Sequence, residues 1–150
     1  MESSLYETDF YGWTIEQSQL LELGKFDRLD LSNLAEEIGA LGRQQRQELE
    51  NRLAILLGHF LKWNLQPELR GKSWKLTIKE QRRQIQRLVK VNPSLKPYLS
   101  EAIIEGYASA LILVAQETLF NYQDLPQECS FRIDQIFAEN FPDGIEIEPY

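Results

Sequence analysis

The only histidine of the chain, His59, lies in a segment whose polar residues recur at helical spacing. At 100° per residue, Gln45, Glu48, Arg52 and His59 fall beside or within the apolar stripe of one helix. An imidazole oriented by a carboxylate, Glu48 or Glu37, could perform acid–base catalysis. The same seam is also typical of a buried polar network, because buried polar groups need partners. The network interpretation is favoured, so these side chains are catalytic candidates only: His59, Arg52, Glu48 and Glu37.

The acidic residues do not follow a metal-ligand pattern. Di-metal sites of helical bundles use a Glu-x-x-His spacing, but position 56, three residues before His59, is Leu56. One Cys and one His offer no zinc-binding spacing. The sequence also lacks a Gly-rich phosphate loop and a Gly-x-Ser-x-Gly elbow. We therefore expect no metal ion and no cofactor.

The clearest chemical anomaly is a basic segment in an acidic chain. Residues 70–90 contain eight Lys or Arg residues and one Glu, a net charge of +7, whereas the remaining residues sum to −14. The predicted basic face consists of Lys72, Lys75, Lys79, Arg82, Arg83 and Arg87. It could be solvated, could bind an acidic protein partner or the chain's own acidic tail, or could bind nucleic-acid phosphates with Trp74 stacking on a base. Nucleic acid is the least favoured, because Trp74 lies on the apolar stripe and the net charge is −7.

Residue choice predicts that helices position these groups. Leu occurs 23 times and Gln 13 times, against three Val and four Thr, and straight-chain residues lose little rotamer freedom in a helix. Thr8, Asp30 and Ser73 are the expected N-caps of the first three helices, and Gly24 is the expected end of the first. The hydrophobic spacing places four helices at about 9–23, 31–64, 74–90 and 94–122.

Two of these helices are expected to be central. The helix over 31–64 is long enough for the first and third helices to lie antiparallel along it. Its continuous apolar stripe is formed by Leu34, Ile38, Leu41, Leu49, Leu53, Leu56 and Phe60. Within it, Gly39 and Gly42 would permit close helix approach. The helix over 94–122 has a second apolar side, which is typical of a central helix, formed by Ile104, Ala108, Ile112 and Ala115.

The fold prediction is therefore a single all-α domain, residues 1–150, built as a bundle of about four main helices with an irregular acidic tail over 123–150. Apolar residues make up 43% and charged residues 26%, a globular balance. The single Cys129 cannot form an internal disulfide, which indicates a reducing compartment. The N-terminus lacks the pattern of a signal peptide, and the longest aliphatic run has six residues. We expect a cytoplasmic protein that uses no membrane, and a homo-oligomer is left open.

Several motifs, taken in order, resemble one known family. They are Tyr6–Trp13, Asn33–Ile38, His59–Trp63 with Gln66-Pro67, Ser73-Trp74, Thr77–Arg82, Pro93–Leu95, Glu117-Thr118 and Gln135-Ile136. Their order and spacing, over about residues 6–142, resemble the domain-of-unknown-function family 29, which is bacterial and numerous in cyanobacteria. The resemblance implies an all-helical cytoplasmic domain, and it supplies no agreed activity, cofactor or catalytic residue.

The best functional expectation is a small interaction or regulatory module without catalysis of its own. One alternative is a nucleic-acid-associated protein that uses the basic helix 70–90. The other is a hydrolase or nuclease-like enzyme built on the polar seam around His59.

Overall fold

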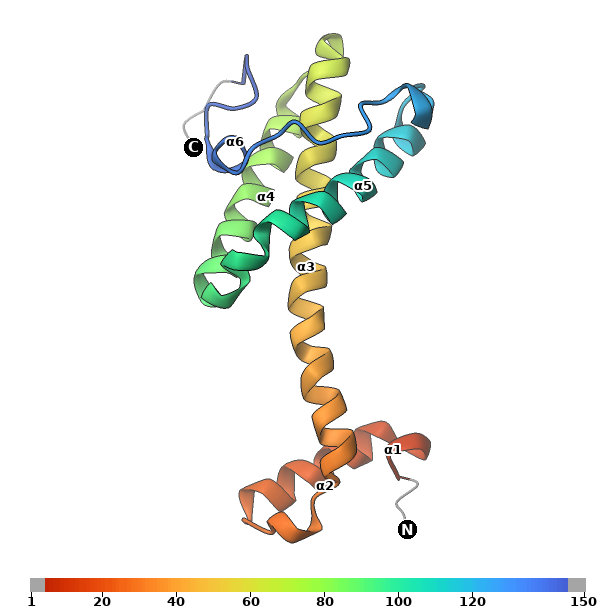
Figure 1. Ribbon diagram of the computed structural model, residues 1–150, viewed down its shortest axis with the longest axis vertical. Coiled ribbons are helices and arrows are strands. Elements are labelled where there is room, and N and C mark those ends of the chain that lie inside the picture. Colours follow the sequence, from red (N-terminus) through yellow and green to blue (C-terminus); the bar gives the residue numbers. More distant parts are fainter. Residues whose placement is uncertain (1–4, 146–150) are drawn as a thin grey trace. The chain divides into compact units, whose positions relative to one another are not determined.

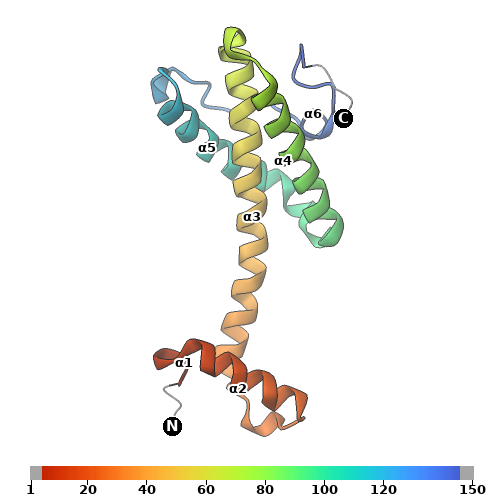
Figure 2. The same ribbon diagram turned by 180° about the vertical axis from the view of Figure 1, so that it is seen from behind.

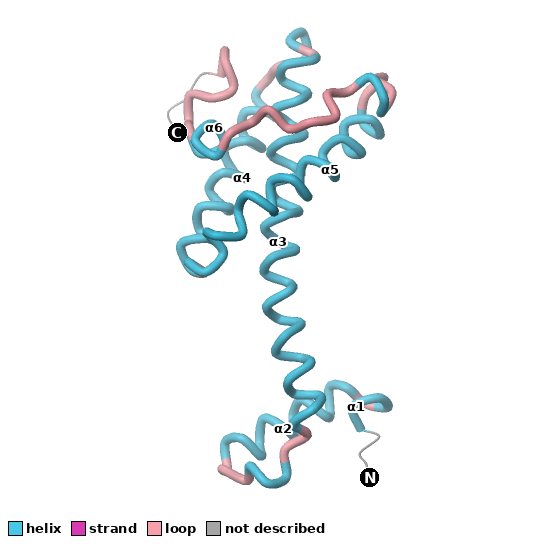
Figure 3. The backbone as a smooth tube through the Cα atoms, in the orientation of Figure 1, coloured by secondary structure: helices cyan, strands magenta, loops and turns pink. Residues whose placement is uncertain are grey.

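The computed structural model describes residues 5–145 (Figure 1). Over these residues the chain forms helices, helical turns and loops, with no β-strand (Figure 3). Four of the helices are long, so the predicted all-α fold with four main helices is confirmed. The chain divides into two compact units, residues 1–44 and residues 45–150. The expectation of a single domain stays a prediction.

The N-terminal unit begins with two helices where the sequence predicts one. α1 (Leu5–Thr8) and α2 (Phe10–Glu22) are separated by Asp9. The Asp9 carboxylate accepts a hydrogen bond from the backbone N–H of Gly12 at 3.0 Å. Asp9 is therefore the N-cap of α2 in place of the expected Thr8, because its side chain satisfies an N–H that the first helical turn leaves unpaired.

The connection to α3 (Leu31–Leu65) turns at Gly24, which has the expected left-handed backbone with a φ of +72°. The short 3₁₀ helix η1 (Phe26–Arg28) follows. Asp30 is placed as the predicted N-cap of α3, since its carboxylate accepts from the N–H of Asn33 at 3.5 Å. α3 has 35 residues and continues into the C-terminal unit.

An aromatic cluster and two hydrogen bonds to Asp30 and Gln17 hold the N-terminal unit together. Trp13 is 2% exposed, and its ring packs against Tyr6 and Phe10 at centroid distances of 4.8 and 5.5 Å. The Trp13 indole donates to Asp30 at 3.0 Å, and the Asp30 N–H donates to Gln17 at 2.8 Å. These contacts place α2 across the first turns of α3 (Figure 1). The predicted antiparallel arrangement of these two helices is wrong.

In the C-terminal unit, α4 (Lys72–Val91) runs beside the second half of α3, and α5 (Leu99–Glu117) crosses it (Figure 2). Fully buried aliphatic side chains fill the space between the three helices, among them Leu49, Leu53, Leu56, Ile78, Ile85 and Val114. α5 approaches α3 closely at Gly106, where an added Cβ would lie 2.9 Å from the Cβ of Leu53. Glycine is what permits this crossing.

The last long helix is shorter than predicted at both ends. Residues 93–98 form a 3₁₀ helix, η3 (Pro93–Tyr98), and the α-helix begins only after Pro97. The proline ring has no N–H to donate to an α-helical hydrogen bond. The helix stops before Thr118, whose backbone is extended and whose hydroxyl donates to the carbonyl of Val114 at 2.6 Å. Similarly, the N-cap of α4 is Gly71, and the predicted cap Ser73 lies inside the helix.

The second apolar side of α5 is exposed, so the prediction that this helix is central is wrong. Ile104 is 65% exposed and Ile112 is 51% exposed. Ile112 also lines an open groove of about 350 Å³ between α3 and α5, together with Asn51, Ala54, Ile55, Ser109 and Leu113. By length and composition alone, residues 93–117 could cross a membrane, a test that the core helix of a soluble protein also passes.

The segment after α5 is irregular over most of its described length, as predicted, and its apolar residues complete the core. It contains the 3₁₀ helix η4 (Tyr122–Asp124) and the helix α6 (Ile133–Phe137). The rings of Phe131 and Phe141 pack edge-on against Phe60 at centroid distances of 5.2 and 5.0 Å. The buried side chains of this segment are Leu125, Ile136 and Pro142. The predicted tail also includes residues 146–150, which lie outside the described residues.

Candidate functional site

α4 presents most of its cations on the side opposite its buried residues. At 100° per residue, the buried Ile78 and Ile85 lie across the helix from the exposed positive side chains. We call the exposed set the basic face: Lys72, Lys79, Arg83, Arg87 and Lys90. Lys75 is half-buried at its edge. Leu76, 37% exposed, lies in the middle of these cations, one turn after Lys72.

Arg82, predicted to belong to the basic face, is buried and holds the C-terminal segment. Its side chain is 6% exposed. The guanidinium donates to the carbonyl of Ile136 at 2.7 Å, to that of Gln135 at 3.1 Å, and to that of Phe141. Burial lowers the pKa of Arg82 to about 10. Because this value is still well above 7, the guanidinium stays charged at neutral pH. Its charge therefore serves the attachment of this segment to α4.

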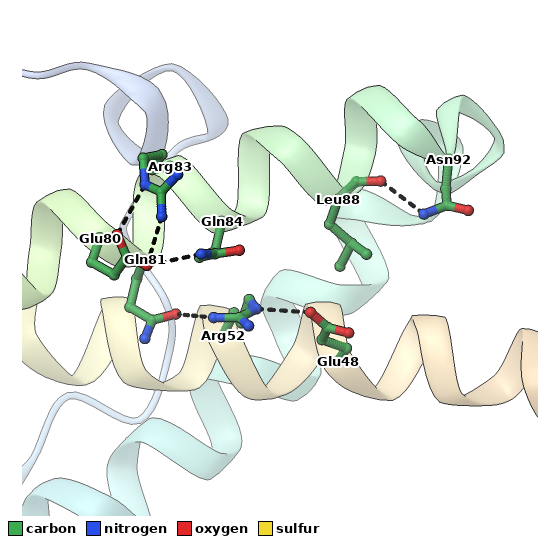
Figure 4. Close-up of polar contacts among 8 residues, drawn as sticks. All are labelled: Glu48, Arg52, Glu80, Gln81, Arg83, Gln84, Leu88 and Asn92. Atoms are coloured by element: carbon green, nitrogen blue, oxygen red, sulfur yellow. Dashed lines mark hydrogen bonds and ion pairs between the residues drawn. The ribbon is translucent and has the colours of Figure 1, made fainter.

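Arg83 stays on the basic face but is paired with Glu80 (Figure 4). Its Nε donates to Glu80 Oε1 at 2.9 Å and its Nη2 to Oε2 at 3.1 Å, while Gln84 donates to the same carboxylate at 2.8 Å. The hydrogen bonds from Arg83 are the largest cause that lowers the pKa of Glu80 to about 2. Because the pair is exposed, its effect on stability is small.

Two of the catalytic candidates, Glu48 and Arg52, form an ion pair that connects α3 with α4. The Nε of Arg52 donates to Glu48 at 3.0 Å, and its Nη1 donates to Gln81 on α4 at 3.3 Å. Figure 4 shows Gln81 pointing toward α3, whereas Arg83 points away from it. The pair has the structural role that the network interpretation predicts for a polar seam.

His59 is not part of that pair, because it bonds within its own helix. Its Nδ1 lies 2.8 Å from the carbonyl oxygen of Ile55, to which it donates. Burial is the main cause that lowers the pKa of His59, so the ring is neutral at pH 7 with a lone pair on Nε2. The edge of the ring faces Trp74 at a centroid distance of 6.4 Å. Trp74 packs against the core, not on the basic face.

Glu37, the fourth catalytic candidate, has a structural partner in the N-terminal unit. It accepts a hydrogen bond from the phenol of Tyr6. This bond is the largest cause that raises the pKa of Tyr6 to about 12. The four candidates thus belong to three separate hydrogen-bonded sets, and the structure does not bring them together as a catalytic constellation.

The remaining titratable side chains offer little nucleophilic or metal-binding chemistry. Burial raises the pKa of the Cys129 thiol, which opposes the thiolate form that nucleophilic attack requires. Its Sγ lies 3.7 Å from the carbonyl oxygen of Phe131. Within residues 5–145, no three His, Cys, Asp or Glu side chains are gathered as a metal site.

Some contacts that position these elements carry no sequence signal, because their partners are far apart in the chain. The Tyr98 hydroxyl donates to Glu50, and the Arg46 guanidinium lies 4.3 Å from the centre of the Tyr98 ring. Lys62 and Glu117 form an ion pair that joins α3 to α5. Such long-range pairs depend on the helix crossing itself, which helical periodicity does not determine.

Comparison with known proteins gives one match. A family model described as "Domain of unknown function DUF29" matches residues 5–142, which is nearly all of the described chain. No curated protein and no solved structure matches the chain.

Proposed function

The chain belongs to the DUF29 family, whose function is unknown, and we propose that it is a non-catalytic interaction module that binds an acidic protein segment on the basic face of α4. The observation that carries this proposal is the exposure of five cations on the side of α4 opposite its buried residues. A single rigid helix then presents positive charge over several turns, which suits a partner with regularly spaced carboxylates.

The chain's own acidic tail was one expected occupant of this face, and its observed contacts favour an external one. The tail reaches α4 through Arg82, on the border of the buried side. Lys72, Arg87 and Lys90 remain exposed in the presence of every described tail residue. A second molecule can therefore reach the basic face without displacing residues 123–145.

A protein partner fits the face better than nucleic acid does. Leu76 is exposed among the cations, and a charged phosphate backbone offers no apolar group to pack against it. Trp74, the predicted base-stacking residue, packs against the core. Glu80 already neutralises Arg83. An acidic amphipathic helix would pair carboxylates with the cations and place one apolar side chain on Leu76.

The test is a binding titration with chemically defined probes. We would use a fluorescent glutamate-rich amphipathic peptide, and single- and double-stranded oligonucleotides of similar net charge, at low and at physiological salt. The Lys72→Gln, Arg87→Gln, Lys90→Gln triple variant should weaken peptide binding about tenfold, since exposed ion pairs contribute about 0.2–1 kcal/mol each. A matched triple variant, Lys25→Gln, Arg28→Gln, Lys96→Gln, removes the same charge from exposed sites outside α4 and should bind as wild type does.

Two outcomes would contradict the proposal. One is equal weakening by both triple variants, which would indicate a response to net charge alone. The other is tighter binding of an oligonucleotide than of the peptide at physiological salt, with steep salt dependence. Four cations that each neutralise one phosphate of a duplex would give a loss of about 150-fold for a fourfold increase in salt. That result would favour the nucleic-acid alternative.

A further inference from the structure

The first half of α3 carries large apolar side chains that are exposed. Leu31 is 67% exposed, Ile38 is 66% exposed and Leu41 is 60% exposed, while Leu34 between them is half-buried. All four lie within the N-terminal unit. Exposed aliphatic side chains scattered singly are ordinary, but three on one line of a helix, with a half-buried fourth between them, are typical of an interaction surface. We call these four residues the α3 stripe.

The spacing of the α3 stripe is that of a two-helix seam. Its residues follow one another at intervals of three, four and three positions, the a and d pattern of a heptad repeat. The flank of the stripe is open, since a Cβ added at Gly42 would meet nothing within 4 Å. The charged residues Glu36 and Arg43 lie away from the stripe by helical angle and pair with each other at 3.1 Å. A second helix can therefore approach closely without burying a charge.

We propose that the α3 stripe pairs with the same stripe of a second copy of this chain, in an antiparallel seam. A heptad stripe packs best against a helix with the same repeat, and a second copy supplies that repeat at matching length. Two-fold pairing is also the commonest arrangement of identical subunits. The surface lies outside α4, so this inference is independent of the function proposed for the basic face.

Charge determines the antiparallel direction. Residues 1–30, which precede the stripe, contain seven acidic and two basic residues, a net charge of −5. Parallel pairing would bring two such acidic segments side by side. Antiparallel pairing separates them and places the acidic segment that ends at Asp30 toward the far end of the other copy's stripe, which the basic residue Arg46 follows. Opposite charges that meet in one orientation and like charges that meet in the other select that orientation.

The first test is sedimentation equilibrium of the full chain, with a matched pair of variants. Wild type should approach twice the chain mass of 17.5 kDa as its concentration rises to about 100 μM. Ile38→Arg should stay at 17.5 kDa, because it would bury a charge in an apolar seam. Ile104→Arg is the control, because Ile104 is 65% exposed on α5 and Ile38 is 66% exposed on α3. Circular dichroism and thermal melting verify that both variants fold. Ile38→Leu, which keeps an apolar side chain at this position, should dimerise as wild type does.

A wild-type chain that stays monomeric throughout this range overturns the inference. So does a dimer that Ile104→Arg disrupts and Ile38→Arg does not, since that result would move the interface to α5. Equal dissociation by both variants also contradicts it, because only one of the two positions lies on the α3 stripe.

The second test measures direction with spin labels. Cys129 is the only cysteine, so Cys129→Ser with Gln47→Cys gives one label in each copy. Gln47 lies beyond one end of the stripe. Antiparallel pairing puts the two labelled positions about 30 Å apart along the seam, whereas parallel pairing puts them side by side at about 10 Å. A double electron–electron resonance distance near the shorter value would overturn the antiparallel arrangement.

Discussion

The two halves of α3 present the same kind of apolar stripe to very different surroundings. In the C-terminal unit Leu49 and Leu53 are fully buried, whereas in the N-terminal unit Ile38 and Leu41 are 66% and 60% exposed. Residue type, spacing and helix are alike in both halves. The difference teaches that helical periodicity identifies a face, whereas its burial depends on which other elements have apolar surface to place on it.

The neighbours of each half explain the difference. In the C-terminal unit, α4, α5 and the segment with α6 all contribute apolar side chains to one core. In the N-terminal unit, only Trp13 and Gln17 are buried among the described residues, and hydrogen bonds such as the one from Trp13 to Asp30 fix α2. Hydrogen bonds orient elements but add little net free energy, whereas apolar burial adds about 25 cal/mol per Å².

The largest expected effect contrasts one leucine from each half. Leu53→Ala should lower the free energy of unfolding by about 2–5 kcal/mol, because Leu53 is fully buried and the substitution leaves a cavity. Leu41→Ala should change it by less than about 0.5 kcal/mol, because Leu41 is 60% exposed. Urea melts at concentrations where the protein is monomeric measure both. Equal losses at the two positions would remove the distinction between the halves.

The next prediction tests whether the C-terminal segment is required to bury the second half of α3. Arg82→Gln should destabilise by about 1–3 kcal/mol, because the buried carbonyl of Ile136 and the partly buried carbonyls of Gln135 and Phe141 lose their donor. Arg83→Gln, on the neighbouring exposed residue, should cost less than about 1 kcal/mol. Hydrogen exchange should accelerate over residues 132–142 in the first variant only. Unchanged exchange there would show that Arg82 does not hold this segment.

Much of this fold could be predicted from the sequence, because helices are local. The bounds of α3 and α4 follow from apolar spacing and loop residues, and Gly24 has the left-handed turn that its residue type favours. The packing of α2 across α3 could not be predicted, since it depends on the contact between Trp13 and Asp30, 17 residues apart.

The candidate site shows the same limit. The basic segment is evident from composition, and five of its six predicted residues lie on or at the edge of the exposed side of α4. Arg82 differs because it is at the border of the buried side, and its partners are the carbonyls of a segment more than 50 residues away. Similarly, helical angle places His59 beside Arg52, but the two side chains have different partners. His59 bonds to the carbonyl of Ile55, and Arg52 donates to Glu48.

The smallest expected effect is the pH dependence of stability that arises from His59, which is half-buried in the C-terminal half of α3. The folded pKa of His59 is lower than its unfolded pKa, chiefly because of burial. As pH falls below about 6.5, the unfolded chain therefore gains a proton first, and stability decreases by at most about 1.4 kcal/mol per pH unit. Above that range His59 has no effect. Melts of wild type and His59→Gln from pH 7.5 to 5.5 measure this, and identical pH slopes would contradict a half-buried His59 that is neutral at pH 7.

The difference between the two halves of α3 is tested most directly by hydroxyl-radical footprinting. The protein should be diluted until sedimentation shows a monomer, so that self-association does not protect the exposed half. Oxidation should then be fast at Ile38 and Leu41 and undetectable at Leu49 and Leu53, in line with their exposed fractions. Protection of Ile38 and Leu41 in the monomer to the same degree as Leu49 and Leu53 would contradict the account.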